Sequence, residues 1–165
     1  MSRLNRFSTW TKLVKTVARI QRLRTREQGD LVTVEERRRA AEAVFKLVQQ
    51  QAFPQELRAL QNNPQGGSLF SSSPLYRLDA RLVEGLIRVG GRLNGSTLSS
   101  ELKHPIILPK DSHITNLILS HYHAQICHQG RGQTLMELRA IEFWVIGGSK
   151  AVAQVHTQMC AVPVT

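Results

Sequence analysis

The sequence predicts an α+β protein that is mostly helical, with a helical N-terminal segment followed by a small β meander and three further helices. Three observations support this prediction. Apolar residues recur every three or four positions over the first 60 residues, they alternate with polar residues from Leu86 to Leu93 within a β part of about 82–109, and the helical spacing returns from about 112 to 160. A chain of 165 residues has room for one ordinary domain, or for one small domain with a helical arm, which excludes a large multidomain enzyme.

The first predicted helix runs from Trp10 to Leu23 and is amphipathic and basic. Its apolar positions recur every three or four residues, with Lys12, Lys15, Arg19 and Arg22 between them. Such a helix either packs an apolar stripe and leaves a solvated basic face, or contacts a membrane surface or nucleic acid.

A second helix is predicted from about Val34 to Gln51. Thr33 and Glu36 have the spacing of a capping box at its start. The run Arg37-Arg38-Arg39 is either an interaction patch or a solvated face paired with nearby glutamates three or four residues away. Those glutamates are Glu35, Glu36 and Glu42.

A short third helix, starting after Phe53-Pro54 and ending near Gln61, precedes a stretch rich in Asn, Gly, Ser and Pro. We therefore predict a basic helical arm over 1–61, a flexible connector over 62–75 and a small domain over 76–165.

Within this domain, Leu86 to Leu93 reads as a bent strand around a glycine pair, and Ile106 to Leu108 as a second strand between two prolines. Asn94-Gly95 is a turn signal between them. The three helices that follow are predicted at about 112–127, 132–139 and 149–159.

The charge balance points to polyanionic partners. The chain has 22 Lys+Arg against 12 Asp+Glu, a formal charge of +10, and the excess is greatest before residue 60. No stretch approaches the roughly 20 consecutive apolar residues of a membrane span, and cations interrupt the N-terminal region where a signal peptide needs an apolar run. We expect an intracellular protein, nuclear or cytoplasmic, in which two cysteines serve for metal binding or are simply buried.

All six histidines and both cysteines lie beyond residue 100. His123 and His128 are separated by four residues, and a further 31 residues separate His128 from Cys160. Zinc prefers tetrahedral imidazole and thiolate ligands, some supplied locally and others by a distant element. The alternative is that these residues are buried or exposed without a ligand role.

These residues also belong to a longer stretch that resembles the integrase zinc-binding domain of Pao-type LTR retrotransposon polyproteins. The resemblance is strongest from Leu82 to Cys160. It is carried by His121-Tyr-His-Ala-Gln-Ile-Cys-His-Gln-Gly-Arg131, Thr134-Leu135, Arg139, Phe143-Trp-Val-Ile-Gly147, Ala151-Val152 and Cys160, preceded by Gly85 to Leu93 and Lys103 to Lys110.

The resemblance implies that His123, His128 and Cys160 are zinc ligands. The family pattern ends in Cys-x2-Cys, and this chain has Pro163 at the position of the second cysteine. Proline cannot bind zinc, so we expect a weakened site. His156, four residues before Cys160, is a possible substitute ligand, and the other candidates are His121, Cys127 and water.

No stretch resembles the catalytic core of an integrase, so we expect no enzymatic activity and no small-molecule substrate. The resemblance implies a transposon-derived module that binds DNA or another nucleic acid, self-associates, or does both. Candidate phosphate contacts are Arg131, Arg88, Arg92 and Lys103, and Phe143-Trp144 is expected in the core of the helical part. The alternatives are a remnant open reading frame without function, and a protein- or membrane-interaction module that uses the first helix.

Overall fold

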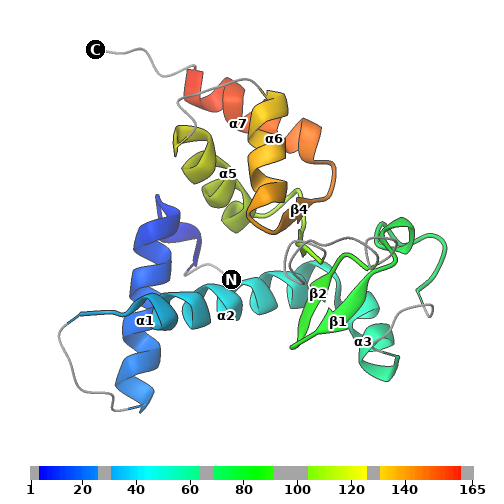
Figure 1. Ribbon diagram of the computed structural model, residues 1–165, viewed down its shortest axis with the longest axis horizontal. Helices are drawn as coiled ribbons and strands as arrows, with labels where there is room; N and C mark the ends of the chain where they lie inside the picture. The colour runs from blue at the N-terminus through cyan, green and yellow to red at the C-terminus, as the bar shows by residue number, and fades with distance from the viewer. Residues whose placement is uncertain (1–3, 26–30, 64–68, 91–103, 126–130, 161–165) are drawn as a thin grey trace.

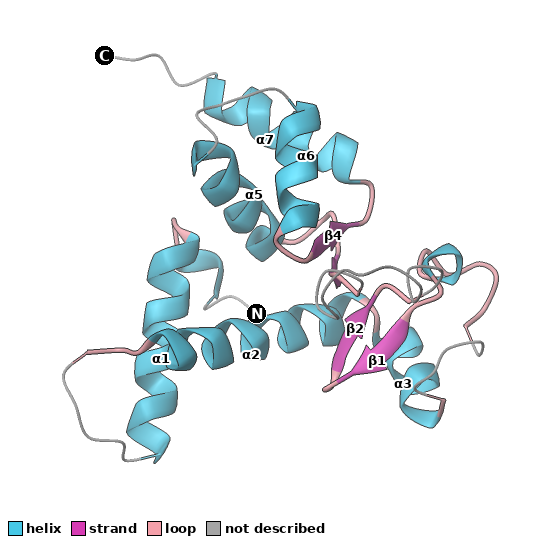
Figure 2. Ribbon diagram, viewed as in Figure 1, coloured by secondary structure: helices cyan, strands magenta, loops and turns pink. Residues whose placement is uncertain are grey.

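The computed structural model describes residues 4–25, 31–63, 69–90, 104–125 and 131–160, and these form an α+β fold that is mostly helical, as predicted (Figures 1 and 2). The elements in chain order are η1 (Leu4–Arg6), α1 (Trp10–Thr25), α2 (Val34–Ala52), α3 (Pro54–Asn62), η2 (Tyr76–Leu78), β1 (Arg81–Val83), β2 (Leu86–Arg88), β3 (Ile106–Leu108), α5 (His113–Gln125), α6 (Arg131–Ala140), β4 (Phe143–Val145) and α7 (Gly148–Cys160).

The start of α2 is set by the predicted capping box. The Thr33 hydroxyl accepts a hydrogen bond from the Glu36 backbone N–H at 3.2 Å, and the Glu36 carboxylate accepts one from the Thr33 N–H. The same carboxylate lies 3.1 Å from Nε of Arg22 in α1. One glutamate therefore caps α2 and joins it to α1.

The arginine run at the start of α2 is at least partly neutralised. Arg38 lies 3.1 Å from Glu35 and 3.2 Å from Glu42, which are one helical turn away on either side. The guanidinium of Arg38 also lowers the pKa of the Glu35 carboxyl group, mainly through their hydrogen bond. For Arg38, the paired-face interpretation is the one observed.

The four-stranded sheet has the order β1-β2-β3-β4. Its first two strands form a tight hairpin, because Glu84 and Gly85 both have positive φ values, 52° and 76°, as a two-residue type I′ turn requires. The predicted turn at Asn94-Gly95 lies outside the described residues. β2 and β3 pair antiparallel, whereas β3 and β4 pair parallel, with Ile107 opposite Trp144.

The strand β4 was not predicted. Phe143-Trp144 was assigned only to the core of the helical part, and Phe143 is indeed buried, but the segment also completes the sheet. Three residues are too few to show an alternating pattern. A parallel partner also needs a crossover, here made through α5 and α6, which no local signal reveals.

The sheet separates two buried clusters because successive side chains of a strand point to opposite faces. Leu86, Ile106 and Leu108 belong to the larger cluster, and Ile87 and Ile107 to the smaller one, which also contains residues of α3 and of the segment 69–80.

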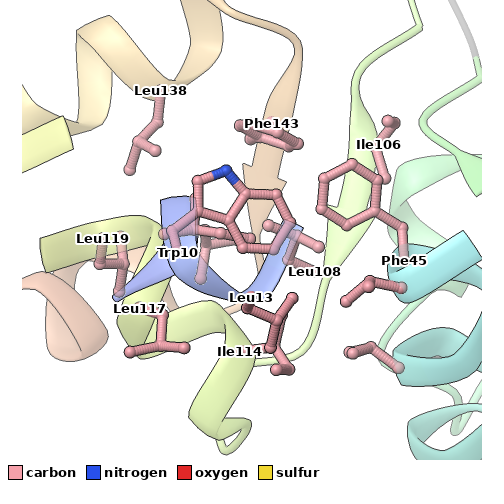
Figure 3. Close-up of a cluster of buried hydrophobic side chains, with 14 of the residues drawn as sticks. Trp10, Leu13, Phe45, Ile106, Leu108, Ile114, Leu117, Leu119, Leu138 and Phe143 are labelled. Carbon is pink, nitrogen blue, oxygen red and sulfur yellow. The ribbon is translucent and has the colours of Figure 1, made fainter. Parts of the chain in front are cut away.

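At the centre of the larger cluster, the ring of Trp10 stacks on Phe45 of α2 with centroids 5.5 Å apart, and Phe45 meets the edge of Phe143 of β4 at 5.3 Å (Figure 3). Leu117 and Leu119 of α5 are also part of it. Residues from α1, α2, β4 and α5 thus share one core. The segment predicted as an arm packs against the rest of the chain, and within the predicted connector Leu75 is fully buried.

Among the described residues, none of the helices is both long enough and apolar enough to span a bilayer.

Candidate metal site and basic surface

The three C-terminal helices bring together the ends of the chain segments that carry the predicted zinc ligands. α5, α6 and α7 all contact one another. The C-terminal ends of α5 and α7 and the N-terminal end of α6 lie at the same end of this helical group, away from β4 (Figure 1). His123 is near the end of α5, and Cys160 is the last residue of α7.

His123 is held in a fixed orientation in this region. Its side chain is buried, with a relative exposure of 1%, and its Nδ1 lies 3.1 Å from Oγ1 of Thr134 in α6. Thr134 is itself fully buried. A metal-binding histidine typically has its second ring nitrogen engaged by a hydrogen-bonding group that orients the ring. With Nδ1 engaged by Thr134, a metal ion would coordinate His123 through Nε2.

The burial of His123 and its contact with Thr134 therefore fit the role of zinc ligand that the resemblance implies for this residue. His128, Cys127 and Pro163 lie outside the described residues, and so do the side chains of His156 and Cys160. The part of the chain that the structure describes contains no group of three His, Cys, Asp or Glu side chains placed to hold a metal ion.

His121 lies on a different side of α5 from His123, because residues two apart on a helix point about 200° away from each other. Its Nε2 is 3.3 Å from Nε2 of Gln125, and its ring meets the edge of Tyr122 at 5.1 Å. Burial raises the pKa of the Tyr122 phenol. The structure thus brings His123 together with Thr134 and not with His121.

Arg88 is held by other parts of the protein. Its guanidinium donates a hydrogen bond of 2.9 Å to the His104 carbonyl and lies 3.5 Å from the Glu142 carboxylate, and its side chain is 13% exposed. These contacts join β2 to the segments that lead into β3 and β4. A phosphate contact by Arg88 remains a prediction. Arg92, Lys103 and the side chain of Arg131 lie outside the described residues.

Two features of this region were not predicted from the sequence. The role of Thr134 follows from no periodicity, since it lies 11 positions after His123, across the connection between two helices. Trp144 faces Arg139, whose guanidinium carbon lies 4.8 Å from the ring centroid, a cation–π contact that occupies this side of the ring.

Among the described residues, α1 carries a row of cationic side chains that recur every three or four positions. Lys12, Lys15 and Arg19 are all exposed, while Trp10 and Leu13 on the opposite side of the helix are buried. The charge pattern of this helix was visible in the sequence, but which side faces solvent depended on its packing.

A separate cavity of about 950 Å³ lies between the end of α2 and the starts of α5 and α7. Its lining is mainly apolar, with Val48, Phe53 and Ile146, and includes Lys110 and Lys150. None of the predicted site residues whose side chains the structure describes lines it.

No protein-family model, curated protein or solved structure matches this chain.

Proposed function

We propose that this chain is a non-enzymatic, transposon-derived nucleic-acid-binding module of the integrase zinc-binding type, with a weakened zinc site formed by His123, His128 and Cys160. The observation that best supports the proposal is the buried contact between His123 and Thr134, at the end of the helical group where α5, α6 and α7 meet. His156 is the candidate for the fourth ligand.

Zinc would serve as a structural clamp in this module. An ion bound by His123 of α5, by His128 and by Cys160 of α7 would join these segments in addition to the apolar contacts of the core. Because zinc binds the native state, it should stabilise the fold, and this stabilisation should grow with the logarithm of the zinc concentration once that concentration exceeds the dissociation constant.

Zinc titration of the purified protein tests the metal part of this proposal. Isothermal titration should show uptake by the wild-type chain and none by His123→Ala. Thr134→Val should still bind zinc but with roughly 10- to 100-fold lower affinity, since it removes only the group that orients the ring. His121→Ala, on the other side of α5, is the matched control and should bind like the wild type.

Thermal unfolding with and without zinc provides a second measurement, because a metal that binds only the folded state raises the midpoint. Absence of zinc uptake by the wild type, or equal uptake by wild type and His123→Ala, would contradict the metal part.

The nucleic-acid part is supported by the formal charge of +10 and by the exposed cations of α1. Fluorescence anisotropy with a labelled DNA duplex should show binding at low salt that weakens steeply as salt rises, because neutralised phosphates release counterions. If the wild type does not bind the duplex at low salt, the proposed nucleic-acid binding is contradicted, whatever the result of the zinc titration.

A further inference from the structure

We infer that the solvent-facing row Lys12, Lys15 and Arg19 of α1 is the surface that takes the phosphate backbone of a nucleic-acid duplex. This inference rests on the proposed nucleic-acid binding and specifies where on the chain it occurs. None of the four phosphate contacts predicted from the sequence belongs to this helix.

The spacing and the packing of α1 create this surface. Positions 12, 15 and 19 differ by three and four residues, so their side chains share one face of the helix. The opposite face is buried through Trp10, Leu13 and other apolar residues. With a rise of 1.5 Å per residue, the row extends over about 10 Å. A DNA duplex carries about one negative charge per 1.7 Å of axis, so a row of this length faces several phosphates.

The charge of this row is not compensated within the described part of the protein. α1 contains no acidic residue, and none of the ion pairs between described residues involves Lys12, Lys15 or Arg19. By contrast, Arg22 of the same helix is paired with Glu36. Arg22 is therefore neutralised by an ion pair within the protein, whereas the outward-facing row can still bind an external anion.

A phosphate backbone is a better partner for this row than a membrane surface. An interfacial helix inserts its apolar face among the lipids, but the apolar face of α1 is already packed in the protein core. The exposed apolar residues of α1 are confined to its C-terminal half, where Ile20 and Leu23 are 50% and 82% exposed. That half extends past the crossing with α2 (Figure 2).

Two triple variants of the full chain test the inference. Lys12→Gln, Lys15→Gln and Arg19→Gln remove the row. The control variant removes the same charge from exposed positions outside α1 that make no ion pair among the described residues, through Lys46→Gln, Arg58→Gln and Arg77→Gln. Circular dichroism should show that both fold like the wild type, since all six positions are exposed.

The α1 variant should bind the labelled duplex at least about tenfold more weakly at low salt. The slope of log affinity against log salt should become less negative by about 2.7, because each of three lost phosphate contacts contributes about 0.9. The control variant should keep most of the wild-type slope. Equal losses in both variants would show that net charge alone matters, and would overturn the inference.

Binding by the wild type that the α1 variant fully retains would also overturn the inference, but it would leave the proposed nucleic-acid binding intact. If the wild type instead binds vesicles containing phosphatidylserine but no duplex, its partner is a membrane surface, and both the inference and the nucleic-acid part of the proposed function fail.

Discussion

Gln49 of α2 makes three hydrogen bonds to the sheet through its side chain. Its amide nitrogen donates to the carbonyl oxygens of Ile87 and Ile107, and its oxygen accepts from the Ile87 N–H, all at 2.8 Å. The side chain is buried, with a relative exposure of 1%. A single polar residue therefore holds β2, β3 and α2 together in a region where water cannot replace the lost hydrogen bonds.

Gln49→Leu should destabilise the protein by roughly 2–4 kcal/mol, because a near-isosteric apolar side chain leaves buried backbone groups of β2 and β3 without their partners. Urea unfolding would measure the change. Gln50→Leu, at the exposed neighbouring position, should change the free energy of unfolding by no more than about 0.5 kcal/mol. Equal effects of the two substitutions would contradict this role of Gln49.

Residues of this kind also set the limit of prediction from sequence. His123 was predicted as a ligand, and its burial beside Thr134 is compatible with that role. Thr134 and Gln49 received no predicted role, because a threonine or glutamine in a helix has the same local sequence pattern whether it faces solvent or bonds to a distant group.

The helices are the elements that the sequence predicted best. α2 was predicted from about Val34 to Gln51 and spans Val34–Ala52, with the capping box at Thr33 as expected. Helical periodicity and capping depend on residues within four positions of each other, so both can be read without knowledge of the fold. The strands are three residues each, too short for a reliable alternation. β1 and β4 were missed, and β2 ends at Arg88, within the longer stretch predicted as one bent strand.

The capping box itself can be tested. Thr33→Ala removes the hydroxyl that accepts from the Glu36 N–H and should lower the free energy of unfolding by about 1 kcal/mol. Thr33→Ser retains the hydroxyl and should remain within a few tenths of the wild type. Chemical denaturation of the three proteins provides the comparison, and an equal loss in the serine variant would show that the methyl group, and not the cap, is responsible.

The N-terminal helices and the C-terminal helical group share the buried cluster around Trp10 (Figure 3). A shared core favours unfolding in a single step, because loss of α1 would expose apolar surface of α2, α5 and β4. A division into a separate arm and a domain, as predicted from composition, would instead allow the arm to unfold first.

The two tryptophans, Trp10 and Trp144, allow each part to be followed separately. In Trp144→Phe, the fluorescence of Trp10 should change at the same urea concentration as the far-UV circular dichroism. In Trp10→Phe, the fluorescence of Trp144 should likewise follow the circular dichroism. An earlier transition of Trp10 would show that α1 unfolds on its own. A gradual transition without cooperativity in either variant would favour the alternative of a remnant reading frame that does not fold stably.

The amino-acid order alone was enough to establish the fold class, the helix boundaries, the cap of α2 and the excess of positive charge, since each depends on composition or on neighbouring residues. Tertiary packing decided the rest. It placed Gln49 beside strands that are 38 and 58 residues away in the chain, and it paired β3 with β4. It also oriented the ring of His123 through Thr134. Arg22 and Arg88 make internal contacts, whereas Lys12, Lys15 and Arg19 remain exposed. These features join residues far apart in the chain, and the free energy that selects them comes from burial and pairing in three dimensions.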